Sequence, residues 1–273
     1  MSKMPALFIP HGGGPCFFMD NDPADLWDDM ENYLRGCIDN LAERPKAILI
    51  ISGHWEEDVI TIQSNPNPPM LFDYGGFPPH TYELNFPAET SQPLISCIVE
   101  LLNQNNIENK LDDQRGYDHG TFIPLLVALP KADIPVVQVS MRSDMNPEAH
   151  IKLGEALQPL RDEGILIVGS GMSFHNLRNM FAQMQQPKPK DFVIQEAQKF
   201  HNWLTNATTN SDPKKRNQLL ANWSSAPMAK YAHPREEHLM PLHVIAGAAG
   251  QNIGKQVLDD LVLGTPQSAF QFD

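Results

Sequence analysis

The clearest pattern along the chain is a set of short, continuous apolar runs that do not alternate with polar residues. Such runs are typical of strands buried on both faces, as in a parallel sheet covered by helices. Each is rich in Ile, Val or Leu and ends at Gly, Pro or Ser, and the four runs are 6–10, 47–52, 134–140 and 165–169. Residues 59–63 alternate instead, which predicts a more exposed strand near an edge of the sheet.

Apolar residues at helical spacing fill the segments between these strands. Residues 22–41 place Leu26, Met30, Leu34 and Ile38 on one face after an Asn-Asp-Pro start signal. Asn146 before Pro147 is a candidate N-cap. The predicted helices are 22–41, 92–102, 147–160, 191–204 and a last one from near 234 toward 247.

Strands that alternate with helices predict an α/β fold with helices on both faces of the sheet. No internal repeat, low-complexity tract or flexible linker divides the sequence. We therefore expect one domain over residues 1–273.

Residues 64–90 form a long segment that is dense in Pro, Gly and aromatic residues and matches no regular element. Loops of this length inside compact domains are usually functional or disordered. The aromatic residues favour a packed lid, although a surface loop pinned by its own aromatic rings is the alternative.

Composition excludes several classes of function. The formal net charge is −13, with 20 Lys plus Arg against 33 Asp plus Glu, and no basic run compensates locally. Such a surface repels phosphate backbones, so nucleic-acid binding is not expected. The sequence shows no secretory signal and no apolar stretch of spanning length. The three cysteines, Cys16, Cys37 and Cys97, read as buried free thiols in a reducing cytosol, which predicts a cytoplasmic protein without membrane association.

The histidines carry the most information about chemistry. His11 directly follows the first predicted strand, His54 follows the second, and His175 lies a few residues beyond the strand 165–169. Ligands of open α/β sheets bind outside the carboxyl ends of the strands. Because neutral imidazole is the commonest protein metal ligand, three histidines at that edge predict a metal site.

A further ligand is expected from residues 231–243, which hold three histidines at intervals of five residues. That spacing puts no two of them on one helix face, so this is not a zincin motif. His238, in the first turn after Pro234, is the candidate, whereas His243 is expected in the core. His80, His150 and His201 are expected on the surface.

His119 stands in Gly-Tyr-Asp-His-Gly before an apolar helical segment. An imidazole titrates near neutrality, so a loop histidine here is a candidate for proton transfer. The glycines at 12–14 and 169–171 do not have the spacing of a dinucleotide-binding loop or a nucleophile elbow.

The same residues carry a family resemblance. MPALFIPHGGGP, ILIISGHW, FDYGGFPPHTYELNFPA, GYDHGTFIPL, GSGMSFHNLR and HPREEHLMPLHVIAGAAG occur in this order along nearly the whole chain. In this the sequence resembles the LigB-type (class III) extradiol ring-cleavage dioxygenases, in particular the DOPA 4,5-dioxygenase branch. The resemblance implies a three-layer α/β/α fold around a mixed, mostly parallel central sheet.

The resemblance also implies roles. His11, His54 and His238 match metal-binding positions, and His175 matches a position that serves either as a further metal ligand or as an acid/base. His119 matches the acid/base histidine, and Tyr82 is a candidate substrate contact. Other branches use a glutamate on the metal, a role that the adjacent Glu237 could take.

The expected function is extradiol cleavage of a catechol (DOPA-like) ring with O₂, in a monomer or small homo-oligomer. Fe(II) is expected for turnover, and Zn(II) is expected in the purified protein because such sites hold zinc readily. A zinc-dependent hydrolase or a non-catalytic metal-binding protein on the same scaffold are the alternatives.

Overall fold

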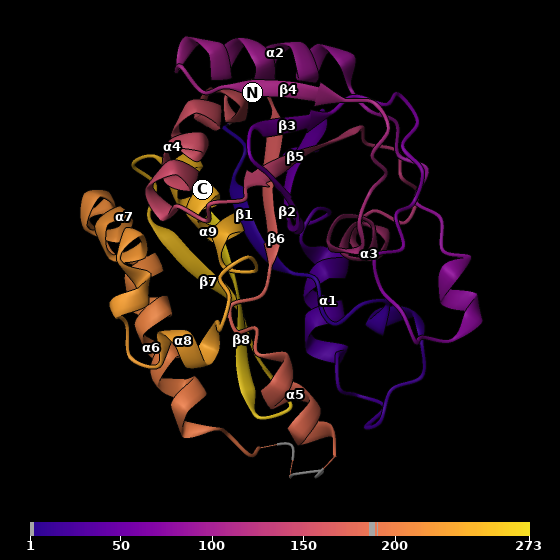
Figure 1. The fold of residues 1–273 in the computed structure, drawn as a ribbon, viewed down its shortest axis with the longest axis vertical. Coiled ribbons are helices and arrows are strands. Elements are labelled where there is room, and N and C mark those ends of the chain that lie inside the picture. The colour runs from indigo at the N-terminus through magenta and orange to yellow at the C-terminus, as the bar shows by residue number, and fades with distance from the viewer. Residues whose placement is uncertain (1–2, 186–188, 190) are drawn as a thin grey trace.

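The computed structural model describes residues 3–185, 189 and 191–273. One mixed eight-stranded sheet runs through it in the order β4-β3-β5-β2-β6-β1-β8-β7 (Figure 1). The strands are β1 (Ala6–Pro10), β2 (Ala47–Glu57), β3 (Ile60–Gln63), β4 (Asn109–Asp112), β5 (Val136–Arg142), β6 (Ile165–Gly171), β7 (Gly254–Val262) and β8 (Thr265–Phe272).

The four strands predicted as buried runs form the centre of this sheet. They pair in parallel as β5-β2-β6-β1, and every residue of β1 and β6 is buried. The expectation that they are covered on both faces is confirmed. The sequence analysis did not anticipate β4 or the antiparallel hairpin of β7 and β8, which pairs with β1.

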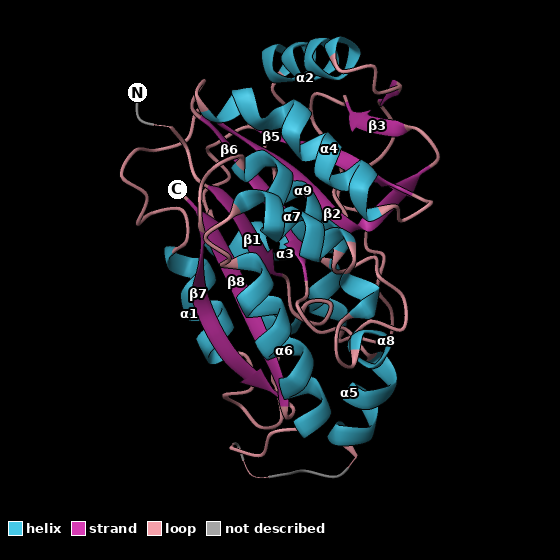
Figure 2. Ribbon diagram, turned by 90° about the vertical axis from the view of Figure 1, so that its left-hand side faces the viewer, coloured by secondary structure: helices cyan, strands magenta, loops and turns pink. Residues whose placement is uncertain are grey.

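Helices cover both faces of the sheet, so the three-layer α/β/α prediction is confirmed (Figures 1 and 2). On one face, α4 and α9 pack on each other and on the central strands, and α2 and α6 extend that layer. On the other face, α1 and α3 pack together with the loop aromatic residues. The α-helices are α1 (Asp28–Gly36), α2 (Gln92–Gln104), α3 (His119–Ala128), α4 (Pro147–Leu157), α5 (Leu177–Met184), α6 (Gln195–Thr208), α7 (Pro213–Ala221), α8 (Ala229–Ala232) and α9 (Met240–Ala249).

Three predicted helix starts were wrong. Helix α1 begins at Asp28 rather than near residue 22, α6 begins at Gln195 rather than at residue 191, and α9 begins at Met240 rather than near Pro234. Pro241 is compatible with the first turn of α9, where its missing N–H costs no intrahelical hydrogen bond. His238 therefore lies in the turn before the helix and not in its first turn.

Predictions of exposure were wrong at several positions. His150 and His201 are buried, because both ring nitrogens of each find partners: Asn146 and Arg142 for His150, Ser268 and Asp259 for His201. Strand β3 lies one place from the edge, as expected, but all four of its residues are buried. Among the cysteines, all free thiols, Cys97 is exposed and Cys37 is only half-buried. His80 is exposed and His243 is buried, as predicted.

Candidate metal centre and active site

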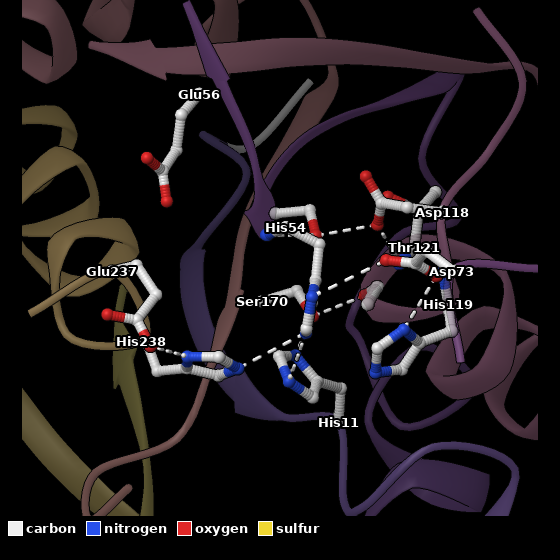
Figure 3. Close-up of polar contacts among 12 residues, drawn as sticks. His11, His54, Glu56, Asp73, Asp118, His119, Thr121, Ser170, Glu237 and His238 are labelled. Atoms are coloured by element: carbon white, nitrogen blue, oxygen red, sulfur yellow. Dashed lines mark hydrogen bonds and ion pairs between the residues drawn. The ribbon is translucent and has the colours of Figure 1, made fainter. Parts of the chain in front are cut away.

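Three histidine rings converge at the carboxyl end of the central strands (Figure 3). The Nε2 atoms of His11 and His54 are 3.2 Å apart, and those of His54 and His238 are 3.1 Å apart. His11 and His238 are buried, and the ring of His54 is about one-fifth exposed. The structure thus brings together three of the four residues predicted as metal ligands.

Backbone geometry fixes these three positions. The N–H of His11 donates to the carbonyl of Gly171 at the end of β6, and the N–H of Met172 donates to the carbonyl of His238. His54 belongs to β2 itself, where the pairing with β5 shifts register between Ile51 and Glu56. Bulges of this kind bend a strand and re-aim its side chains, and here the irregular stretch contains His54.

Two glycines allow the close approach of these segments. A Cβ on Gly171 would overlap the His238 carbonyl, and a Cβ on Gly120 would overlap the Ser52 hydroxyl and approach the His54 ring. Each position therefore requires glycine for packing rather than for a special backbone angle.

The Nδ1 atom of each of these three rings, which points away from the other two rings, has its own partner. Ser170 Oγ lies 3.0 Å from His11 Nδ1 and donates its own proton to the Gly120 carbonyl. His11 Nδ1 must therefore carry a proton and donate it to Ser170. His238 Nδ1 lies 2.9 Å from Glu237 Oε1, and His54 Nδ1 lies 3.5 Å from Asp73 Oδ2. Carboxylates accept and do not donate, so Glu237 places the proton of His238 on Nδ1, whereas the longer Asp73 contact of His54 is not a hydrogen bond.

The hydrogen-bond network thus assigns a lone pair to Nε2 of His11 and of His238, and both atoms face Nε2 of His54. Three imidazole nitrogens that converge in this way are the donor set of a three-histidine metal site, here with hydroxyl and carboxylate partners behind two of the rings. The residues present therefore fit a divalent transition metal.

Electrostatics keeps the three imidazoles neutral. Burial lowers the pKa of His11 and His238 well below the ordinary value, and the neighbouring imidazoles act in the same direction. Burial and the nearby His119 lower the pKa of His54 to about 4. Neutral imidazole is the form that binds a metal.

Glu237 lies behind the three converging histidines. Its Oε1 contacts Nδ1 of His238 and also Nδ1 of His175, at 3.3 Å. Burial opposes its ionisation, but the hydrogen bonds from the two histidines outweigh burial and hold the pKa of Glu237 far below its usual range. Glu237 thus orients a ligand ring.

His175 stacks on His238, with ring centroids 3.5 Å apart. Its donor atom groups with Glu237 and His238 and not with the converging nitrogens of His11 and His54. The structure therefore places His175 beside the three-histidine cluster.

His119 is the first residue of α3, and Asp118 caps this helix by accepting from the N–H of Thr121. The side chain of Asp118 also accepts from Ser52, at 2.7 Å, and from Arg115, at 3.1 Å. These contacts fix the start of the helix, and the His119 ring lies 3.9 Å from that of His54.

Asp73 is the important residue that the sequence analysis missed. Its Oδ1 accepts from the backbone N–H of His119 at 3.0 Å and lies 2.7 Å from His119 Nδ1. Burial opposes ionisation, but these bonds outweigh it and lower the pKa of Asp73. Asp73 therefore accepts a hydrogen bond from Nδ1–H of His119, which leaves the lone pair on Nε2. The signal available in the sequence was that Asp73 is the one aspartate in the loop 64–90.

The loop 64–90 packs on the site through its aromatic rings. Phe72 and Tyr74 contact Phe122 of α3, with centroids 5.6 and 6.3 Å apart, and Phe86 is fully buried. The packed arrangement expected from the sequence is present. Tyr82 packs against Tyr74, at 5.3 Å, and is not among the residues that line the cavity, whereas Tyr74 and Phe77 are.

One cavity of about 770 Å³ opens at this site. Its wall holds the three converging histidines together with His119 and His175. The volume is in the upper part of the range of roughly 300–1,000 Å³ that is typical of small-molecule sites. No helix among the described residues is long and apolar enough to cross a membrane.

Comparison with known proteins identifies the family. The model for the catalytic LigB subunit of aromatic ring-opening dioxygenases matches residues 5–271. A 4,5-DOPA dioxygenase extradiol of Beta vulgaris is 37% identical over 247 residues, which cover 90% of this chain and 87% of that protein. The dioxygenase tasH of Hapsidospora irregularis is 35% identical over 97% of this chain and 84% of its own length.

A solved structure agrees. The crystal structure of an uncharacterized Escherichia coli K12 protein superposes with a TM-score of 0.79 at 27% identity and covers 99% of this chain and 100% of its own. The fold, the histidine cluster and the match over nearly the whole chain lead to the same conclusion: this protein belongs to the LigB family of aromatic ring-opening dioxygenases.

Proposed function

We propose that this protein is an extradiol dioxygenase that opens the aromatic ring of a catechol with O₂ at a metal held by His11, His54 and His238. The observation that carries the proposal is the convergence of three imidazole Nε2 atoms, 3.2 and 3.1 Å from one to the next, at the wall of a large cavity. When bound, Fe(II) would supply the redox chemistry that joins a catechol and O₂. Zn(II) fits the same donors but has no redox chemistry, so a zinc-filled site is expected to be inactive.

His119 is the group that removes a proton from the catechol. Its Nδ1 is held by Asp73 at 2.7 Å, and within the described part of the chain no hydrogen bond holds its Nε2. A carboxylate behind an imidazole fixes the tautomer and stabilises the imidazolium that forms on proton uptake. The same imidazolium can return the proton later in the reaction.

His175 is the second proton carrier in this proposal and not a metal ligand. It is held by Glu237 and stacked on His238, and it groups apart from His11 and His54. Removal of its imidazole should therefore leave metal stoichiometry intact and lower turnover.

The aromatic loop would shield the ring from water. Tyr74 and Phe77 line the cavity next to His119, and the Tyr74 ring lies 5.7 Å from that of His119. Tyr82, predicted from the sequence as a substrate contact, would act indirectly by packing against Tyr74.

The test is anaerobic reconstitution of the metal-free protein with Fe(II) or Zn(II), followed by O₂ uptake and visible absorbance with L-DOPA and simpler catechols. L-DOPA is the first substrate because three relatives, from Beta vulgaris, Portulaca grandiflora and Escherichia coli, have it in their names. A yellow ring-opened product with iron, absent with zinc and in His11→Ala, supports the proposal. A stoichiometric metal without O₂ uptake on any catechol would reject it, and hydrolysis or a non-catalytic role would then be examined.

A further inference from the structure

Helix α5 (Leu177–Met184) presents an apolar stripe that the described core does not cover. Leu177, Met180, Phe181 and Met184 stand at positions i, i+3, i+4 and i+7, which is one face of a helix. None of the eight residues of α5 is buried, and Leu177, Phe181 and Met184 are 46%, 55% and 49% exposed. A helix with this pattern normally turns the stripe into the core, so its exposure here calls for another partner.

The stripe faces the active site. All four residues line the same cavity as the converging histidines, together with Phe77 of the aromatic loop and Trp27 before α1. The chain joins the two features directly, because His175 precedes Leu177 by two residues. The apolar wall is thus an extension of the catalytic site.

Hydrogen bonds on the other side of α5 fix its orientation. Asn176 caps the helix by accepting from the N–H of Asn179, and its Nδ2 donates to the Tyr231 carbonyl at 2.7 Å. The Tyr231 hydroxyl donates to Asn179 Oδ1 at 3.1 Å. These contacts hold α5 beside α8 (Figure 2) and keep the stripe turned to the cavity.

The charges in the cavity disfavour an anionic substituent. Among the described residues that line it, Arg235 is the only lysine or arginine. Both of its terminal nitrogens contact the Glu56 carboxylate, one of them at 2.6 Å, and Glu237 lies 3.8 Å away. A carboxylate on the substrate would therefore find no uncommitted lysine or arginine among the described residues that line the cavity, and the carboxylates of Glu56 and Glu237 lie nearby.

We propose that the apolar face of α5, with Phe77 opposite, is a subsite for the substituent of the substrate, and that this enzyme prefers catechols with an extended, uncharged apolar substituent over amino-acid catechols. This inference rests on the proposed ring-cleavage function and specifies its substrate class. The cavity volume supports it, because one catechol ring fills only a part of about 770 Å³.

The experiment compares 4-methylcatechol with 4-hexylcatechol in two measurements on the metal-loaded protein: anaerobic binding by calorimetry, and kcat/KM from O₂ uptake. Each methylene that enters an apolar subsite should tighten binding by about fourfold. The hexyl compound should therefore bind far more tightly, and 3-(3,4-dihydroxyphenyl)propionate should bind more weakly than 4-propylcatechol of matched length.

Substitutions on α5 test whether this helix causes the preference for an extended apolar substituent. Phe181→Ser and Leu177→Ser should reduce the hexyl-to-methyl ratio of affinities by about tenfold or more, since each removes most of a side chain from the subsite. The matched control is Leu111→Ser, an exposed leucine (55%) on β4, which should leave the ratio unchanged. A ratio near one in the wild-type protein, or a large ratio that both α5 variants retain, overturns the subsite.

The two measurements separate this inference from the function on which it rests. If no catechol supports O₂ uptake but the binding ratio is large and falls in the α5 variants, ring cleavage is rejected and the subsite stands. If O₂ uptake is present with a ratio near one, only the subsite fails. A change from dimer to monomer in Phe181→Ser with an unchanged ratio would assign the face to a second copy of the chain and overturn the proposal.

Discussion

Two sets of buried histidines, one in the core and one at the site, differ in what their Nε2 atoms contact. His233 and His243 lie in the core next to the site, and the pKa of each is lowered, as are those of His11 and His238. The core pair uses backbone carbonyls: His233 Nε2 lies 3.1 Å from the Ser173 carbonyl and His243 Nε2 lies 2.9 Å from that of Leu220. The site histidines instead direct Nε2 at one another.

This comparison shows that burial and a lowered pKa do not mark a metal site by themselves. Both sets are neutral for the same reason, which is the cost of charging a desolvated ring. The distinguishing feature is an Nε2 that faces other imidazole nitrogens, together with an Nδ1 that donates to a side chain. The predictions below test that distinction.

The largest difference in metal affinity is expected between His11→Ala and His243→Gln. Loss of His11 removes one of three ligands, so metal affinity should fall by more than about 100-fold, beyond the loss typical of outer residues. His243→Gln should keep one metal per chain, because residue 243 contacts only backbone carbonyls through its ring nitrogens. Metal analysis after dialysis measures both, and metal loss in the folded glutamine variant would contradict the distinction.

Asp73→Asn should lower kcat by about 100-fold, in keeping with the typical worth of a positioned acid/base. The amide can no longer fix the His119 tautomer or stabilise its imidazolium. Metal content should be retained, since the His54 contact is 3.5 Å long. Steady-state O₂ uptake is compared with Asp113→Asn, an exposed aspartate in the turn after β4. Equal kcat in the two variants would remove Asp73 from the mechanism.

Glu237→Gln should weaken metal binding by about 10- to 100-fold without abolishing it. The glutamine oxygen can still accept from His238 Nδ1, but it lacks the charge that makes the imidazole a stronger donor. Calorimetric titration with Zn(II) gives the affinity. Glu236→Gln is the matched control, because Glu236 pairs with Lys230 at 3.0 Å and does not contact His238. A Glu236 variant as weak as the Glu237 variant would point to a general charge effect.

The smallest effect concerns stability and pH. Burial lowers the pKa of His233 to about 3 and that of His243 to about 4. The unfolded chain binds a proton on each near pH 6.5, whereas the folded chain does not, so stability falls as pH drops from about 6.5 toward those values.

Each of these two histidines should lower the free energy of unfolding at pH 5 by about 2 kcal/mol relative to pH 7.5. Urea unfolding of the metal-free protein at both pH values measures the loss. His243→Gln should show a loss smaller by about 2 kcal/mol, whereas His80→Gln, at an exposed position, should behave as the wild type. A pH dependence that His243→Gln leaves unchanged would show that this histidine is not buried in its neutral form.

The central sheet could be predicted from sequence because its strands are continuous apolar runs. The β7-β8 hairpin could not: β7 carries Asp259 and Asp260, and β8 contains Pro266, Gln267 and Ser268. These polar residues of β8 are buried because Gln267 and Ser268 bond to the segment around Ser173, far away in sequence. Long-range partners of this kind leave no periodic pattern.

The site, like the sheet, could be predicted only in part. His11 and His54 could be placed because each follows a strand whose end is visible in the sequence. Asp73 and Tyr74 could not, since they stand on an irregular loop whose position depends on ring packing against Phe122. The expectation that His150 and His201 are exposed was wrong because polar neighbours in a helix do not reveal which face meets the core.

The irregular stretch of β2 limits which sequence changes the position of His54 can tolerate. Between its pairings with Val139 and Met141 of β5, the strand accommodates residues 52–55 without partners in β5. Side chains alternate along a strand, so loss of a single residue here would turn His54 away from the other two rings. Substitutions at Ser52 or Trp55 alter local contacts, whereas a one-residue deletion would displace the His54 ring without changing any of the three converging histidines. Insertions and deletions at this position should thus be far less tolerated than amino-acid replacements.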